Sequence, residues 1–321
     1  MTQVLASDAL VATGRCGPGW LAVEDGRVVD QGVGAAPPGA RHLGPRVLSP
    51  GLVDLQLNGH GPIDVAHAEG EDWDRLAVTL RPTGVTSFLP TLCSAPLDLY
   101  PAAFDRIAAA RRILAAPRIE GVHLEGPFLG GAPGAHPTDL LAPVDLDWLD
   151  AALAGHPGLI RLVTLAPEAD PDHAGTRLLV DRGVVVALGH STCTFEAAIE
   201  AARAGARLVT HLGNGMRPLH QRDPGLLGAA LADAGLTPTV IADGVHLHDA
   251  FLGIVLSQRP DAILVTDAVA TGGTVFGAPV ETRDGAAWLT DGTLTGSTLT
   301  LDRSEEHTSE LQSHSDLVCR L

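Results

Sequence analysis

Apolar runs alternate with amphipathic stretches along most of the chain. Eight runs read as strands buried on both faces, as in a parallel sheet. They cover residues 52–57, 86–91, 120–125, 161–166, 184–189, 207–212, 238–243 and 262–267. Stretches rich in Ala, Leu and Arg lie between them, for example 102–115 and 195–204, and are typical of helices. This alternation predicts an α/β fold, a (β/α)8 barrel of the TIM type over residues 51–302.

The first 50 residues have a different pattern. A short apolar stretch at 20–23 is followed by a turn at 24–26 and a second stretch at 27–29, and Gly and Pro cluster over 32–39. Short strands separated by turns predict a small β module ahead of the barrel. After the eighth strand, the regularly spaced glycines of residues 276–296 predict a hairpin.

Side chains that bind metals or transfer protons stand at the ends of several apolar runs. Glu125, His190, His211 and Asp267 each lie at, or one residue from, the end of one predicted strand. The carboxyl ends of barrel strands meet at the rim that carries the active site in such folds, so we expect these side chains to lie together. A catalytic zinc site takes three ligands from His, Glu, Asp or Cys and keeps one position for water.

Glu125, His190 and His211 supply such a ligand set, and Asp267 is the candidate proton acceptor and donor. Taken singly, each residue has an ordinary alternative. A histidine at a strand end can be a hydrogen-bonded core residue, and an aspartate there can cap the next helix. Two histidines and a glutamate at one rim favour the metal site.

Composition and charge restrict the partners. The chain of 321 residues is 45% hydrophobic and has a formal net charge of −17, which argues against nucleic acid or an anionic membrane as the main partner. A small anion bound by a few Arg side chains is compatible with this net negative charge.

The cysteines, Cys16, Cys93, Cys193 and Cys319, form no CxxC motif, which favours free thiols in a reducing cytosol. Without a signal-peptide pattern or a membrane-length apolar run, the predicted location is cytoplasmic.

Six segments together carry a family resemblance. They are residues 49–59 (SPGLVDLQLNG), 121–128 (GVHLEGPF), 189–191 (GHS), 210–216 (THLGNGM), 241–246 (IADGVH) and 265–268 (VTDA). In this order and at these spacings the chain resembles the N-acetylglucosamine-6-phosphate deacetylases of the amidohydrolase superfamily over residues 1–302. The resemblance implies removal of acetate from N-acetylglucosamine 6-phosphate by metal-activated water, in amino-sugar recycling.

The resemblance also assigns roles to residues. It implies that Glu125, His190 and His211 hold one divalent metal ion per subunit, zinc or alternatively iron or another divalent ion. Asp267 is then the general acid/base. The implied substrate-binding residues are His136, Asn214, Gly215, Arg222, His246, Leu294, Thr295 and Gly296. Arg222 suits a phosphate because guanidinium pairs with phosphate oxygens in a bidentate manner. The partners implied are a phosphorylated amino sugar and a second copy of the chain in a homodimer.

Three departures from the family pattern bear on these expectations. Gln56 and Asn58 stand where many amidohydrolases carry His-x-His, and neutral amides are poor zinc ligands, which predicts a single metal. The segment before His136 lacks the basic residues often found there. Residues 303–321 differ in composition from the rest, and the first eleven resemble a translated sequencing adapter. We interpret them as a non-native tail in place of an eighth helix, expected from near Ser297, and of the strands that would complete the β module.

Alternatives to this function stay open. One is deacetylation of the galacto epimer, N-acetylgalactosamine 6-phosphate, or action on a cyclic amide as another amidohydrolase. Arg222 and the loop at Asn214 favour a phosphosugar over a cyclic amide, although Arg222 has an alternative interpretation as a solvated loop charge. A further alternative is an inactive, truncated fragment that cannot close its barrel.

Overall fold

The structure, a computed structural model, describes residues 2–12, 15–271 and 274–301. The chain divides into two compact units, with the break between Gly51 and Leu52. The predicted tail at 303–321 lies outside the described residues.

The first unit is a small β module, as the sequence predicts. Strands β1 (Gln3–Ala12), β2 (Arg15–Glu24) and β3 (Arg27–Val33) form an antiparallel meander. The short strands β4 (Arg41–His42) and β5 (Val47–Leu48) pair parallel with β1. Asp25 and Gly26 connect β2 to β3 with φ values of 49° and 73°. Such two-residue loops match the twist of the flanking strands, which explains why Asp-Gly marks this turn in the sequence.

The second unit contains eight parallel strands, one within or overlapping each predicted run. They are β6 (Leu52–Leu57), β9 (Val85–Leu92), β11 (Val122–Glu125), β12 (Ile160–Leu165), β13 (Val185–Leu188), β14 (Leu208–Val209), β15 (Thr237–Val240) and β16 (Ile263–Leu264). Each strand pairs with the next in this order.

The sheet closes between its first and last strands. The backbone N–H of Asp267 donates to Gln56 O at 3.0 Å, and the N–H of Asn58 donates to Ala268 O at 2.8 Å. Leu57 and Ala268 form a parallel bridge between these two bonds. The predicted (β/α)8 barrel is therefore confirmed.

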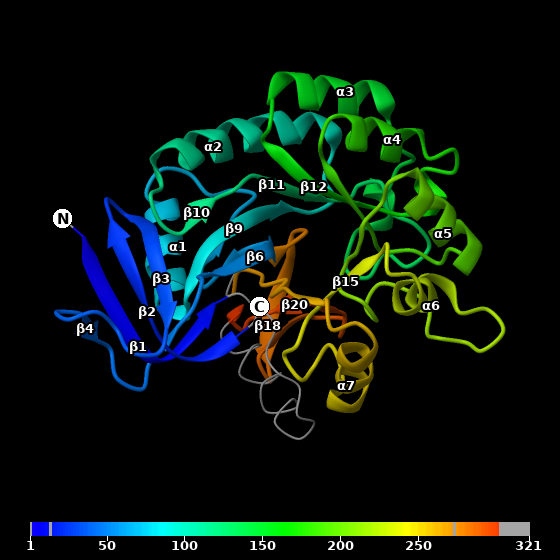
Figure 1. Cartoon of the computed structure of the whole chain (residues 1–321). Helices are drawn as coiled ribbons and strands as arrows, with labels where there is room; N and C mark the ends of the chain where they lie inside the picture. The colour runs from blue at the N-terminus through cyan, green and yellow to red at the C-terminus, as the bar shows by residue number, and fades with distance from the viewer. Residues whose placement is uncertain (1, 13–14, 272–273, 302–321) are drawn as a thin grey trace. The chain divides into compact units, whose positions relative to one another are not determined.

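One helix follows each of the first seven barrel strands. The helices are α1 (Asp72–Leu80), α2 (Tyr100–Ile113), α3 (Leu146–Gly155), α4 (Ala174–Asp181), α5 (Phe195–Ala204), α6 (Gly225–Ala232) and α7 (Asp249–Gln258). They lie around the outside of the strands (Figure 1). In α5 the side chain of Thr194 caps Ala197 N, and the helix buries Ala198, Ala201 and Ala202. This spacing places the three alanines on one face of the helix, and all three belong to the hydrophobic core.

Short elements complete this unit. They are β7 (Gly59–His60), β8 (Ile63–Asp64), β10 (Arg118–Ile119), η1 (Arg81–Thr83), η2 (Leu97–Leu99), η3 (Thr138–Leu140) and η4 (Pro167–Ala169). The segment predicted as a hairpin is a four-stranded antiparallel sheet of β17 (Thr274–Val275), β18 (Ala278–Arg283), β19 (Ala286–Leu289) and β20 (Leu294–Ser297). Ser297, near which a helix was expected to begin, ends β20, and its N–H donates to Asp267 O at 3.0 Å. Leu301, the last described residue, has helical geometry.

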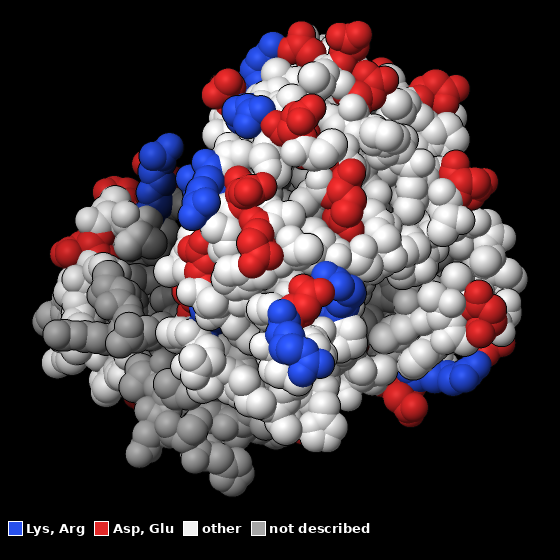
Figure 2. All heavy atoms as spheres, turned by 90° about the vertical axis from the view of Figure 1, so that its right-hand side faces the viewer, with Lys and Arg blue, Asp and Glu red and all other residues white. Residues whose placement is uncertain are grey.

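Acidic side chains outnumber basic ones in the chain, and the surface reflects this. On the face drawn in Figure 2, Asp and Glu are scattered over the upper, middle and right-hand parts of the described surface, and Arg occurs in small separate groups. Among the described helices, none combines the length and the hydropathy that crossing a bilayer requires.

Candidate metal and acid–base site

The three predicted metal ligands converge in the barrel. The Glu125 Oε1 atom lies 3.1 Å from His190 Nε2 and 3.0 Å from His211 Nε2, and the two ring nitrogens are 3.0 Å apart. All three side chains are buried. They come from the ends of three strands: Glu125 ends β11, and His190 and His211 follow β13 and β14 by two residues.

This arrangement fits a metal ion. The Nδ1 atom of His190 lies 3.2 Å from the carbonyl oxygen of Ala132, so that an N–H there leaves the Nε2 lone pair to face Glu125. Metal-binding histidines usually donate their other ring N–H in this way. Zinc bonds of about 2.0–2.2 Å place tetrahedral N and O ligands roughly 3.3 Å apart, close to the separations observed. When the rings instead carry a proton on Nε2, burial opposes ionisation of Glu125, but hydrogen bonds from His190 and His211 outweigh it and hold the pKa of Glu125 well below its usual range.

The backbone at the site is held in an uncommon conformation. His190, His211 and Asp267 have φ values of 48°, 32° and 49°. Residues other than glycine rarely adopt the left-handed region, and when they do they cluster at functional sites. The three turns direct the side chains into the barrel mouth directly after the strands end.

Asp267 lies beside the ligand cluster. Its Oδ1 atom accepts from Gln56 Nε2 at 3.0 Å and from Asn58 Nδ2 at 2.6 Å. Gln56 Nε2 also donates to Glu125 Oε1 at 2.9 Å, so one amide connects the two carboxylates. Burial and the nearby charge of Glu125 raise the pKa of Asp267 well above its usual range. A carboxyl group that holds its proton in this way is suited to proton transfer.

A pocket of about 740 Å³ opens above the cluster. Of the twelve predicted site residues, it is lined by Glu125, His136, His190, His211, Asn214, Gly215, His246, Asp267, Leu294 and Thr295. Gly215 approaches the His190 ring so closely that an added Cβ would lie 2.8 Å from Nδ1. Gly296 lies just behind the pocket, where an added Cβ would meet Asp267 O at 2.5 Å. Arg222 is exposed and does not line the pocket.

His246 is oriented by a carboxylate. Its Nδ1 atom lies 2.6 Å from Asp243 Oδ2, while Asp243 Oδ1 accepts from the N–H groups of His246 and Val245. Burial opposes ionisation of Asp243, but these bonds from His246 and Val245 lower the pKa of Asp243. The carboxylate therefore fixes the ring with Nδ1 as the donor, which leaves Nε2 for other contacts.

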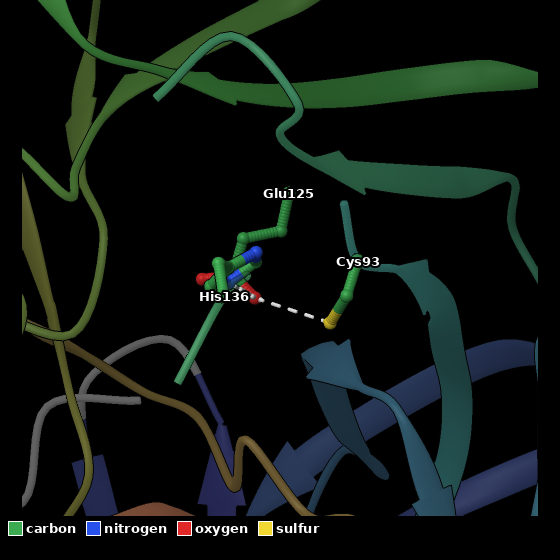
Figure 3. Close-up of side chains that lie close together, drawn as sticks. All are labelled: Cys93, Glu125 and His136. Atoms are coloured by element: carbon green, nitrogen blue, oxygen red, sulfur yellow. Dashed lines mark hydrogen bonds and ion pairs between the residues drawn. The ribbon is translucent and has the colours of Figure 1, made fainter. Parts of the chain in front are cut away.

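The sequence did not single out Cys93. This thiol follows β9 and lies 3.8 Å from Glu125 Oε2 and 3.1 Å from Asn58 Oδ1. Figure 3 shows it directed at the Glu125 carboxylate, beside His136. The sequence analysis interpreted Cys93 as an ordinary free thiol, because it belongs to no motif, and did not predict its position in the pocket. Its position at the end of an apolar run, like that of Glu125, was the available signal.

The chain is similar to known deacetylases in both sequence and structure. No protein-family model matches the chain. The human N-acetylglucosamine-6-phosphate deacetylase is 37% identical over 83% of this chain, which spans 66% of the human protein. The N-acetylgalactosamine-6-phosphate deacetylase of Escherichia coli O157:H7 is 33% identical over 97% of this chain and 85% of its own length.

Among solved structures, a mutant of the N-acetyl-D-glucosamine-6-phosphate deacetylase from Mycobacterium smegmatis, in complex with N-acetyl-D-glucosamine-6-phosphate, superposes with a TM-score of 0.90. It is 32% identical, and the match covers 95% of this chain and 83% of that one. Identity of this extent, together with the same fold over nearly the whole chain, places the protein in the N-acetylglucosamine-6-phosphate deacetylase family of the amidohydrolase superfamily.

Proposed function

We propose that this protein hydrolyses the acetamide of N-acetylglucosamine 6-phosphate to glucosamine 6-phosphate and acetate. The observation that carries the proposal is the convergence of Glu125, His190 and His211 beside Asp267 at the mouth of one pocket. Family membership supports the same reaction.

One divalent cation, zinc, is proposed at Glu125, His190 and His211. Two imidazoles and one carboxylate are a ligand set found in catalytic zinc sites. When bound to these residues, such a cation would supply polarisation of the acetamide carbonyl and a water molecule acidic enough to attack it near neutral pH. Gln56 and Asn58 supply neutral amides at the neighbouring position and both donate to Asp267, which supports a single tightly held ion.

Asp267 is proposed to carry the proton. It accepts a proton from the attacking water and returns it to the amine nitrogen as the C–N bond breaks. Hydrogen bonds from Gln56 and Asn58 to Oδ1 fix the orientation of the carboxyl group during both transfers. The raised pKa of Asp267 supports the donating step, because a carboxyl with an ordinary pKa would release its proton to solvent first.

The remaining pocket residues are proposed to bind the sugar. His136, Asn214, His246 and Thr295 offer polar groups around the cluster, and Leu294 offers an apolar contact. A role of Arg222 in phosphate binding rests on the resemblance and on guanidinium chemistry, not on its present position in an exposed loop. The dimer that the resemblance implies also stays a proposal, which light scattering would test.

Acetate release from N-acetylglucosamine 6-phosphate by the zinc-loaded protein is the direct test. We expect turnover that chelation abolishes and zinc restores. N-acetylgalactosamine 6-phosphate is the second candidate substrate, favoured by the long match to the Escherichia coli enzyme. A hydantoin serves as the cyclic-amide control. Turnover of the hydantoin with neither phosphosugar hydrolysed would contradict the proposal.

A further inference from the structure

We propose that the pocket holds a second cation site, specific for thiophilic divalent ions, formed by Cys93 Sγ, Glu125 Oε2, His136 Nε2 and Asn58 Oδ1. The inference rests on the proposed function in one respect, since Glu125 also belongs to the proposed catalytic metal site. The second site is loaded only when such a metal is in excess.

The ligand atoms already lie at bridging distances. Cys93 Sγ is 3.8 Å from Glu125 Oε2 and 3.1 Å from Asn58 Oδ1, and His136 Nε2 is 4.0 Å from Glu125 Oε2. The sulfur, nitrogen and carboxylate atoms all lie within 4.8 Å of one another. Zinc–sulfur and zinc–oxygen bonds of about 2.3 and 2.0 Å can span roughly 4.3 Å, so Cys93 and Glu125 reach one ion without backbone movement.

The hydrogen bonds around the proposed second site are compatible with free electron pairs on Asn58 Oδ1 and His136 Nε2. Asn58 donates its Nδ2 to Asp267, and its Oδ1 therefore faces Cys93. His136 Nδ1 lies 2.8 Å from Ser94 Oγ and 3.4 Å from the Ser94 backbone N–H, which can only donate, so a bound cation has to select the tautomer with the ring proton on Nδ1. In the tautomer that donates this N–H to the hydroxyl, Nε2 presents its lone pair to Glu125 Oε2 at a distance too long for a hydrogen bond. Binding a cation releases the thiol proton to solvent and gives all four acceptors a common partner.

Glu125 separates the two sites. Its Oε1 atom contacts His190 and His211, whereas its Oε2 atom contacts Cys93 and lies nearest His136 (Figure 3). A carboxylate with one oxygen on each side can bridge two cations, as Glu and Asp do in two-metal centres. Thiolate and imidazole ligands favour zinc or cadmium over magnesium or calcium, which sets the specificity.

Cadmium titration tests the site. The protein is first loaded with one equivalent of zinc, in a background with Cys16→Ser and Cys319→Ser. We expect a second equivalent, cadmium, in equilibrium dialysis and an ultraviolet thiolate-to-cadmium charge-transfer band. Cys93→Ser should lose both. Cys193→Ser, the matched control at a buried thiol outside the pocket, should keep both.

A further variant tests the geometry. Ser94→Ala removes the hydroxyl that orients His136, and loss of such an outer partner typically weakens metal binding roughly 10- to 100-fold. The inference is overturned if saturation stops at one equivalent, or if the band persists in Cys93→Ser. Acetate release is not a readout here, so a protein that shows the band without deacetylase activity would defeat the proposed function and leave the second site standing.

Discussion

Asp267 lies between two neutral amides and a carboxylate, and this environment determines what a substitution there would do. In Asp267→Asn the side chain keeps its size, but it cannot accept a proton. We expect kcat to fall by about 100- to 10,000-fold, the usual range for loss of general acid/base catalysis, while zinc binding is retained. Acetate release and metal analysis of the same preparation measure both effects. Asp181→Asn, at an exposed helix end, is the matched control. Activity of Asp267→Asn within a few-fold of the control would assign the proton transfer to another group.

Asp54 is a second buried carboxyl whose protonation should be visible in stability. Burial raises the pKa of Asp54 from 3.8 to about 6, although hydrogen bonds from Thr266 and Gln56 offset part of the shift. The folded protein therefore holds this proton more tightly than the unfolded chain. The resulting stabilisation is complete below pH 3.8 and is lost as the pH rises through about 6.

The test compares wild type with Asp54→Asn, whose amide does not titrate. From pH 7 to pH 4, wild type should gain up to about 3 kcal/mol in the free energy of unfolding relative to the variant. Denaturant titrations at several pH values give this difference, in which the titration of other groups cancels. Parallel pH profiles for the two proteins would show that Asp54 has an ordinary pKa.

Individual site residues differ in how far the sequence could predict them. Glu125, His190, His211 and Asp267 end or follow apolar runs, and a parallel barrel brings such positions to one rim. Cys93 occupies a similar place, but a cysteine outside a motif carries no signal of its own. The left-handed backbone at the two histidines and Asp267 could not be foreseen either, because the enrichment of His and Asp in that region does not single out these three positions.

At the scale of the strand, close packing limits what the barrel tolerates. Gly189 follows β13, and an added Cβ would lie 2.8 Å from Thr164 Cγ2 and 3.0 Å from Thr210 Cβ. Gly189→Ala should lower the free energy of unfolding by about 1–3 kcal/mol, the usual cost of overpacking. It should also weaken zinc binding, because His190 is the next residue.

Gly253 in α7 provides the control, since an added Cβ would meet nothing within 4 Å. Gly253→Ala should stabilise the protein by roughly 0.5–1 kcal/mol through higher helix propensity. Chemical denaturation and zinc affinity are measured for both variants. Equal stability of the two would mean that the strand end relaxes around the added methyl group.

The sequence predicted the presence of each barrel strand better than the residues at which the strand begins and ends. The apolar runs marked all eight barrel strands, but only two residues of 207–212 and of 262–267 form strand. After these strands the backbone is no longer extended, and the positive φ angles of His211 and Asp267 direct their side chains into the pocket. The antiparallel sheet β17–β20 was underestimated because its strands are short and only partly buried, so they show little hydrophobic patterning.

At the scale of the whole molecule, the metal should contribute to stability. A ligand that binds only the folded state at 100 times its Kd adds about 2.7 kcal/mol to the free energy of unfolding. Chelation should therefore lower the melting temperature of wild type, and added zinc should restore it. Glu125→Gln, which loses one ligand charge, should melt at a temperature that no longer depends on chelator. A melting temperature of wild type that is insensitive to chelator and zinc would mean that no cation is held by the native protein.

Closure of the barrel has a consequence for the order in which the site is assembled. Gln56 and Asp267 lie 3.0 Å apart but are separated by 211 residues along the chain. During synthesis on the ribosome, His211 completes the ligand set 56 residues before Asp267 emerges. The nascent chain thus acquires its metal ligands before it has a proton acceptor. In refolding, we expect zinc uptake to precede the return of acetate release, whereas simultaneous recovery would mean that the ligands assemble only when the last strand docks.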